Sequence, residues 1–173
     1  DDITYFRDSE LALIQTYKSL LDLQFALDQS SIISVTDASG NIISFNDNFV
    51  RISGFDRNEI IGQNHRIINS SYHSKFFFQE MWETISSGKV WHGEIKNKRK
   101  DGSTYWVDSH IIPFLDENGV PFQYISIRTD ITLKKGAEEL LAANEEKFRL
   151  LYENAPIGIM LVDIDGHITE CNE

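Results

Sequence analysis

Cysteine and proline are scarce in this sequence, which holds one cysteine and three prolines among 173 residues. A single cysteine, Cys171, excludes an internal disulfide and any metal cluster built on cysteines. The longest apolar run, residues 157–162, is far shorter than the roughly 20 residues that a membrane-spanning helix needs. No signal-peptide pattern opens the chain. We therefore expect a cytoplasmic protein, or the cytoplasmic portion of a membrane receptor.

Basic residues are also few, since 16 lysines and arginines stand against 27 aspartates and glutamates. The formal net charge is −11, and an acidic surface disfavours nucleic acids and anionic membranes as partners. We expect neither nucleic-acid binding nor direct membrane contact. Apolar residues make up 41% and charged residues 25% of the chain, which is typical of an ordinary globular protein.

Two helical segments flank a β-rich body. Residues 1–28 are predicted to form an N-terminal amphipathic helix, because apolar side chains recur at helical spacing at Leu13, Tyr17, Leu20 and Leu27. Residues 133–150 are predicted to form a linker helix. Its apolar spacing fits a coiled-coil seam and a simple surface helix equally well.

Residues 29–132 are predicted to be the globular body. Alternating apolar and polar residues, separated by turns rich in Gly, Asn and Asp, predict five strands at 32–36, 41–45, 90–99, 103–113 and 121–131. Between the second and third strands the sequence is more helical. The strongest helix is predicted over 73–87, and Gly88 follows it as a C-cap.

The segment "TDASGNIISFND" at 36–47 aligns without gaps with "VDIDGHITECNE" at 162–173. Four residues of the first segment, Asp37, Gly40, Ile42 and Asn46, match Asp163, Gly166, Ile168 and Asn172 of the second. The two segments begin 126 residues apart, which is the length of a whole domain. Residues 151–173 are therefore predicted to be the start of a second, truncated copy.

An asparagine lies in line with apolar residues in the third predicted strand. Trp91, Ile95 and Asn97 share one face, and the charged residues of the strand share the other. A buried amide without hydrogen-bond partners costs about 1–3 kcal/mol. Asn97 therefore predicts either a nearby backbone acceptor or a ligand whose edge carries both donors and acceptors.

The fourth predicted strand has large apolar groups on both faces. Tyr105 and Val107 alternate with Trp106 and Ile112, and we expect Tyr124 of the next strand on the face of Trp106. Both faces are therefore expected to be covered at least in part. The N-terminal helix, from the same chain or from a partner, is available as the cover.

The order of these elements, together with "GFDRNEIIGQN", "KNKRKDGSTYWV" and "SIRTDIT", resembles a PAS domain over about residues 26–132. The resemblance implies an α+β fold, with a five-stranded antiparallel sheet, helices on one face and a pocket between them. Amphipathic helices would flank this domain at both ends. A second copy begins at about residue 148, at "FRLLYENAPIGI".

The stretch "MWETISSGKVWHGEIKNKRKDGSTYWV" is similar to the flavin-binding PAS domains of the aerotaxis receptor and of the nitrogen-fixation redox regulator. In those domains FAD lies in the pocket between sheet and helices. The cofactor-binding residues that this resemblance implies are Asn97, Trp82, His65, Ser34, Trp91, Asn64 and Ser109. An ordinary His pKa near neutrality would also let His65 follow a proton of the flavin.

We therefore expect a sensory PAS module of a multidomain signalling protein that binds FAD and reports redox or oxygen status. The C-terminal helix would carry the signal to an output domain, and the N-terminal helix and a sheet face would form a homodimer. The alternatives are a ligand-free dimerisation or relay module, and a sensor of haem or of a small organic ligand. For haem, His65 or His73 could be recruited as the axial ligand.

Neither an enzyme nor a metal site is expected. No nucleophile stands in a pattern with a placed base, and no phosphate loop or kinase motif is present. His73, His92 and His110 lack the spacing of metal ligands along the chain.

Overall fold

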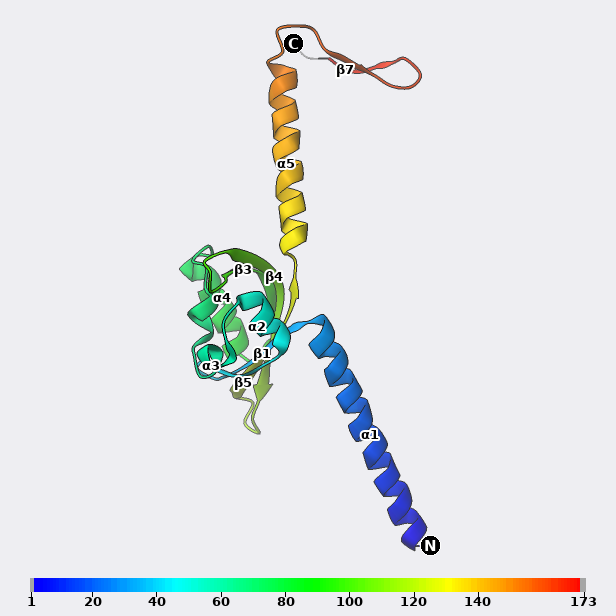
Figure 1. Cartoon of the computed structure of the whole chain (residues 1–173), viewed down its shortest axis with the longest axis vertical. Coiled ribbons are helices and arrows are strands. Elements are labelled where there is room, and N and C mark those ends of the chain that lie inside the picture. Colours follow the sequence, from blue (N-terminus) through cyan, green and yellow to red (C-terminus); the bar gives the residue numbers. More distant parts are fainter. Residues whose placement is uncertain (1, 172–173) are drawn as a thin grey trace. The chain divides into compact units, whose positions relative to one another are not determined.

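The computed structural model describes residues 2–171 and divides the chain into two units that join at Ile131 and Thr132. The first unit contains, in chain order, α1 (Asp2–Ser30), β1 (Ile32–Asp37), β2 (Ile42–Phe45), α2 (Asp47–Ser53), α3 (Arg57–Ile60), the 3-10 helix η1 (His65–Ile68), α4 (Lys75–Ser86), β3 (Trp91–Lys98), β4 (Thr104–Leu115) and β5 (Pro121–Asp130) (Figure 1). The second contains α5 (Thr132–Glu153), β6 (Met160–Val162) and β7 (Ile168–Cys171).

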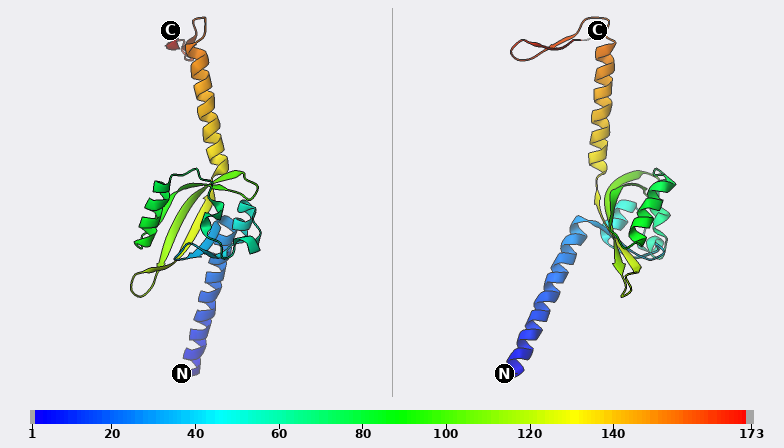
Figure 2. Two further views of the ribbon diagram at one scale, coloured as in Figure 1. Left: turned by 90° about the vertical axis from the view of Figure 1, so that its left-hand side faces the viewer. Right: turned by 180° about the vertical axis from the view of Figure 1, so that it is seen from behind.

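Five strands form one antiparallel sheet in the order β2-β1-β5-β4-β3. Figure 2 shows the helices α2, α3 and α4 on one face of this sheet. The predicted α+β fold, a five-stranded antiparallel sheet with helices on one face, is confirmed. The core lies between the two layers and includes Phe49 of α2, Ile85 of α4 and Val107 of β4.

Asn46 fixes the start of α2 against the sheet. Its Oδ1 accepts hydrogen bonds from the backbone N–H of Phe49, at 3.2 Å, and of Ile33 in β1, at 3.0 Å. Its Nδ2 donates to the carbonyl of Ser31 at 2.7 Å. One side chain therefore caps a helix and also joins it to the first strand.

The buried face of the sheet follows the predicted alternation in β3 and β4, where Ile95 and Asn97 lie opposite Val107 and Tyr105. The expectation for Tyr124 is wrong. Tyr124 is buried on the pocket face, because it pairs with Pro113 of β4 and Thr36 of β1, which also point inward.

The other face of the sheet is not covered by α1 in the single chain. Leu13, Tyr17 and Leu20 of α1 are 70%, 63% and 59% exposed. Trp106 instead contacts Tyr72, with ring centroids 5.2 Å apart, and the ammonium of Lys96 lies 5.5 Å from its centroid. Trp106, which was predicted to need a cover, is therefore covered by neighbouring side chains of the same chain.

The second unit repeats the first hairpin in detail. Asp37 Oδ1 accepts from the backbone N–H of Asn41 at 2.8 Å, and Asp163 Oδ1 accepts from that of His167 at 2.8 Å. The strand register shifts after Val35 in one hairpin and after Leu161 in the other, positions that correspond in the repeat. The fourth matched residue, Asn172, lies outside the described residues.

Among the described helices, none has both the length and the apolar character that crossing a bilayer requires.

Candidate functional site

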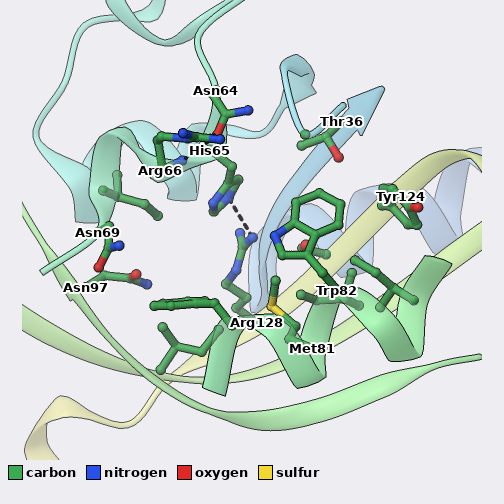
Figure 3. Close-up of a pocket in the computed structure, with 17 residues that line it drawn as sticks. Thr36, Asn64, His65, Arg66, Asn69, Met81, Trp82, Asn97, Tyr124 and Arg128 are labelled. Carbon is green, nitrogen blue, oxygen red and sulfur yellow. Dashed lines mark hydrogen bonds between the residues drawn. The ribbon is translucent and has the colours of Figure 1, made fainter. Parts of the chain in front are cut away.

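A pocket of about 320 Å³ lies between the sheet and the helices α4 and η1. Its volume falls at the lower end of the range of roughly 300–1,000 Å³ that is usual for small-molecule sites. Apolar walls come from Ile68, Phe78, Met81, Trp82, Ile85, Ile95, Ile111 and Tyr124. Polar groups come from Thr36, Asn64, His65, Arg66, Asn69, Asn97, Ser126 and Arg128 (Figure 3).

Asn97 lines this pocket from β3 and is only 5% exposed. Its backbone forms a bridge with Asn69, but its carboxamide makes no hydrogen bond with any residue that the structure describes. The carboxamide faces the pocket, where a ligand or water can reach it. The pocket therefore offers a donor and an acceptor on one side chain, both free for a ligand.

Arg128 of β5 brings a positive charge into the same pocket, where it is 3% exposed. Its guanidinium donates to Ser34 Oγ at 3.0 Å. It also donates to His65 Nε2 at 2.7 Å (Figure 3). Among the described residues no carboxylate forms an ion pair with it. Burial lowers the pKa of Arg128 to about 10, which still leaves the group charged at neutral pH.

His65 begins η1 and accepts a hydrogen bond from Arg128 through Nε2. Because an arginine can only donate, Nε2 carries no proton, and the neutral ring holds its proton on Nδ1. Burial, followed by the charge of Arg128, holds the pKa of His65 well below its usual value. The expectation that His65 titrates near neutrality is wrong, and its imidazole is neutral at pH 7.

Trp82 of α4 forms an aromatic wall of the pocket and packs edge-on against Tyr124, with ring centroids 5.7 Å apart. The ring also lies against Gly40, where an added Cβ would be 3.0 Å from Trp82 Cη2. Gly40 has φ +82°, a backbone conformation that favours glycine. Glycine at position 40 therefore allows the turn after β1 to form and leaves room for the Trp82 ring.

Four of the seven predicted site residues line the pocket: Asn97, Trp82, His65 and Asn64. The amide of Asn64 is occupied within its loop, because Nδ2 donates to the Ser39 carbonyl at 3.0 Å and Oδ1 accepts from Arg66 Nε at 2.8 Å. Asn64 thus stabilises its loop. Of these two pocket asparagines, only Asn97 has a carboxamide that is free to bind a ligand.

The other three predicted residues are buried on the inward face but lie outside the lining. Ser34 stands behind Arg128 as its hydrogen-bond acceptor. Trp91 packs edge-on against Phe77, with centroids 5.6 Å apart. Ser109 pairs with Arg128 in the β4–β5 register, and its hydroxyl has no hydrogen-bond partner in the described part of the chain.

Among the polar lining residues, sequence reasoning missed Arg128, together with Thr36, Arg66, Asn69 and Ser126. A signal was present in β5, because Tyr124, Ser126 and Arg128 alternate and therefore share a face. Placing Tyr124 on the correct face would have placed Arg128 in the pocket.

Comparison with known protein families identifies the family of this chain. Residues 29–133 match the PAS domain family, and residues 146–173 match a second PAS domain model. The chain belongs to the PAS domain family. The sequence similarity and the pocket between sheet and helices agree with this membership.

The chain is similar to parts of two longer proteins. The chain is 33% identical over 147 residues to a nitrogen fixation regulatory protein of Klebsiella oxytoca, and the match covers 84% of this chain and 30% of the relative. It is 36% identical over 124 residues to the aerotaxis receptor of Escherichia coli K12, covering 72% of this chain and 23% of the receptor. The chain thus spans less than a third of the length of these curated relatives.

Solved structures share the fold. An RNA-binding light-oxygen-voltage receptor superposes with a TM-score of 0.62 at 23% identity, covering 72% of this chain and 36% of that one. At this level of identity the likeness supports the PAS fold and no more.

Proposed function

We propose that this chain is a sensory PAS module that binds a flavin, specifically FAD, and reports redox or oxygen status to a downstream output domain. The observation that carries the proposal is the free, buried carboxamide of Asn97 in a pocket with aromatic and aliphatic walls. The sequence similarity to an aerotaxis receptor and to a nitrogen fixation regulatory protein supports a sensory role.

The pocket residues fit a flavin by their chemistry. A flat aromatic ring system suits Trp82 and the aliphatic side chains around it. The pyrimidine edge of a flavin alternates donors and acceptors, and the carboxamide of Asn97 offers both. Arg128 adds a positive charge to the pocket. A flavin ring gains electron density on reduction and would balance this charge. When bound, the flavin would supply reversible electron transfer.

The residues of the chain connect this pocket to the following helix. Arg128 lies on β5, which ends at Asp130, and α5 begins at Thr132. A change in charge beside Arg128 would alter its hydrogen bonds to Ser34 and His65 and thereby bias the end of β5. We propose this as the route from the pocket to the linker helix.

The structure also bears on the competing ligands. Axial ligation of haem through Nε2 would break a hydrogen bond that each candidate already makes. Nε2 of His65 accepts from Arg128, and Nε2 of His73 accepts from the Lys96 N–H at 2.9 Å. Light sensing through a cysteinyl adduct is disfavoured as well, because the single cysteine, Cys171, lies in the second unit. A small organic ligand that pairs with Asn97 is the second candidate.

Identification of the bound molecule tests the proposal. The chain is expressed with ample riboflavin and purified, and the ligand is then released by denaturation and analysed by mass spectrometry. FAD in near-stoichiometric amount is the expected result. Release of a non-flavin metabolite would overturn the flavin assignment, and protein that stays empty after incubation with FAD would favour the ligand-free relay module.

A further inference from the structure

Three potential metal ligands meet on the outer face of the sheet, opposite the pocket. His92 of β3 pairs directly with His110 of β4, and Asp108 lies two residues before His110. Because side chains alternate along a strand, all three point to the same face. β3 and β4 are neighbours in the sheet (Figures 1 and 2).

The side chains of these residues are already close to one another. The imidazoles of His92 and His110 are stacked, with centroids 4.1 Å apart and planes 20° from parallel. His92 Nε2 lies 2.6 Å from Asp108 Oδ1. One nitrogen or oxygen atom from each residue lies within 4.8 Å of the others.

We propose that His92, Asp108 and His110 form a binding site for a divalent transition-metal ion of the zinc type. Zn²⁺ takes His nitrogen and carboxylate oxygen at about 2.0–2.2 Å, so two ligands at a tetrahedral angle lie about 3.4 Å apart. His92 Nε2 and Asp108 Oδ1, now 2.6 Å apart, would move apart by about 0.8 Å to reach that spacing. The remaining donor spacings, all within 4.8 Å, would shorten by no more than about 1.4 Å. All three side chains are at least partly exposed and can make this movement.

The ligand set selects the class of metal. Two imidazoles and one carboxylate suit Zn²⁺, Ni²⁺ or Cu²⁺, whereas Mg²⁺ and Ca²⁺ prefer oxygen ligands alone. Three protein ligands leave the fourth tetrahedral position for water or for a donor from another molecule. Since the ligands come from β3 and β4, a bound ion would clamp these two strands together.

This inference does not depend on the flavin proposal, because the site and the pocket lie on opposite faces of the sheet. The chain contains a second group of this kind, Asp163, Asp165 and His167, in the turn between β6 and β7. There Asp163 Oδ1 holds the turn itself by accepting from the backbone N–H of Asp165 and His167. This group has one imidazole instead of two and serves as the internal control.

Titration of the full chain with Zn²⁺ at pH 7.5, followed by calorimetry, tests the site. The variants His92→Ala, His110→Ala and Asp108→Asn are each expected to weaken Zn²⁺ binding at least tenfold, and His167→Ala is expected to leave it unchanged. Co²⁺ bound to the unaltered chain should give the intense visible absorption of tetrahedral coordination. Circular dichroism verifies that the variants, all at surface positions, remain folded.

Three outcomes would overturn the proposal. One is that the unaltered chain takes up no Zn²⁺. Another is that the β3 and β4 variants bind as tightly as the unaltered chain. The third is that His167→Ala alone removes the binding, which would place the ion in the β6–β7 turn.

Discussion

Arg128 enters the pocket as a buried guanidinium whose acceptors, Ser34 Oγ and His65 Nε2, are both uncharged. An unbalanced buried cation is unfavourable on its own and becomes favourable when negative charge develops beside it. Reduction adds electron density to a flavin, so in the proposed complex Arg128 would stabilise the reduced form more than the oxidised one. Arg128 would then act mainly on the redox potential of the flavin.

Replacing Arg128→Gln is expected to lower the midpoint potential of the bound flavin by about 30 mV or more, which corresponds to about 1.4 kcal/mol in a two-electron couple. Spectroscopic redox titration measures this change. Lys98→Gln, on the exposed face of β3, is the control and should leave the potential unaltered. A potential that is the same in Arg128→Gln and in the unaltered chain would contradict this role.

The neutral state of His65 makes the fold sensitive to acid. The unfolded chain protonates this residue near pH 6.5, whereas burial and Arg128 keep the pKa of folded His65 well below that value. Between the two pKa values the unfolded state binds more protons, so the stability that is present above pH 6.5 is lost as the pH falls.

Urea denaturation between pH 7.5 and pH 5 should show the free energy of unfolding falling more steeply in the unaltered chain than in His65→Gln. The difference in slope is expected to approach about 1.4 kcal/mol per pH unit. His167→Gln, in the other unit, is the matched control. Equal slopes for His65→Gln and the unaltered chain would show that folded His65 titrates normally.

Single residues of the site were predictable where a pattern or a resemblance indicated them. The alternation in β3 placed Asn97 inward, and the resemblance pointed to Trp82 and His65. Arg128 was missed because an arginine in a strand usually indicates the wet face. Arg128 can be buried because Ser34 and His65 accept its hydrogen bonds. These residues lie 94 and 63 positions away in the sequence, so local sequence patterns do not reveal them.

Polar side chains join the elements of the first unit, and Asn46 is one of them. Its three hydrogen bonds connect the start of α2 to β1 and to Ser31, the residue before β1. A seven-residue helix has little stability of its own, so α2 depends on this cap and on the burial of Phe49.

Asn46→Ala is expected to destabilise the first unit by about 2 kcal/mol, since an N-cap is worth about 1 kcal/mol and a further lost hydrogen bond about another. Chemical denaturation monitored by tryptophan fluorescence measures the loss, because Trp82, Trp91 and Trp106 all lie in this unit. Asn118→Ala, at an exposed turn position, is the control. A change below about 0.5 kcal/mol in Asn46→Ala would show that the cap is dispensable.

Most strands and the long helices were predictable because their patterns are long. The strands begin and end within about two residues of the predicted positions. Differences of this size are usual at the ends of an element. The short helices α2, α3 and η1 were not separated in the sequence, because four to seven residues contain too little periodicity. The inward face of β5 was misassigned because its pairing, and not its own sequence, sets which side faces the pocket.

At the scale of the whole molecule, α1 presents apolar side chains to solvent, since Leu13, Tyr17 and Leu20 are mostly exposed. A helix of 29 residues with this pattern gains stability by pairing with another helix. We propose that the partner is the same helix of a second copy, which gives the homodimer expected from the sequence.

Leu20→Glu is expected to weaken dimerisation at least tenfold, which corresponds to about 1.4 kcal/mol. Sedimentation velocity over a range of protein concentrations measures the change. Lys18→Glu, which also introduces a negative charge on α1, is the control for charge alone. A chain that sediments as a monomer without any substitution, or a dimer that Leu20→Glu leaves intact, would contradict this pairing.

Flavin retention by two neighbouring variants of β3 tests the central claim most directly. Asn97 points into the pocket and Lys98 points away from it, so the pair differs in the face that is altered and not in the strand. The absorption spectra of the unaltered chain, Asn97→Leu and Lys98→Ala are recorded after incubation with FAD and removal of excess. The account predicts a yellow unaltered chain and a yellow Lys98→Ala, with most of the flavin lost from Asn97→Leu; equal flavin in the two variants, or a colourless unaltered chain, would contradict it.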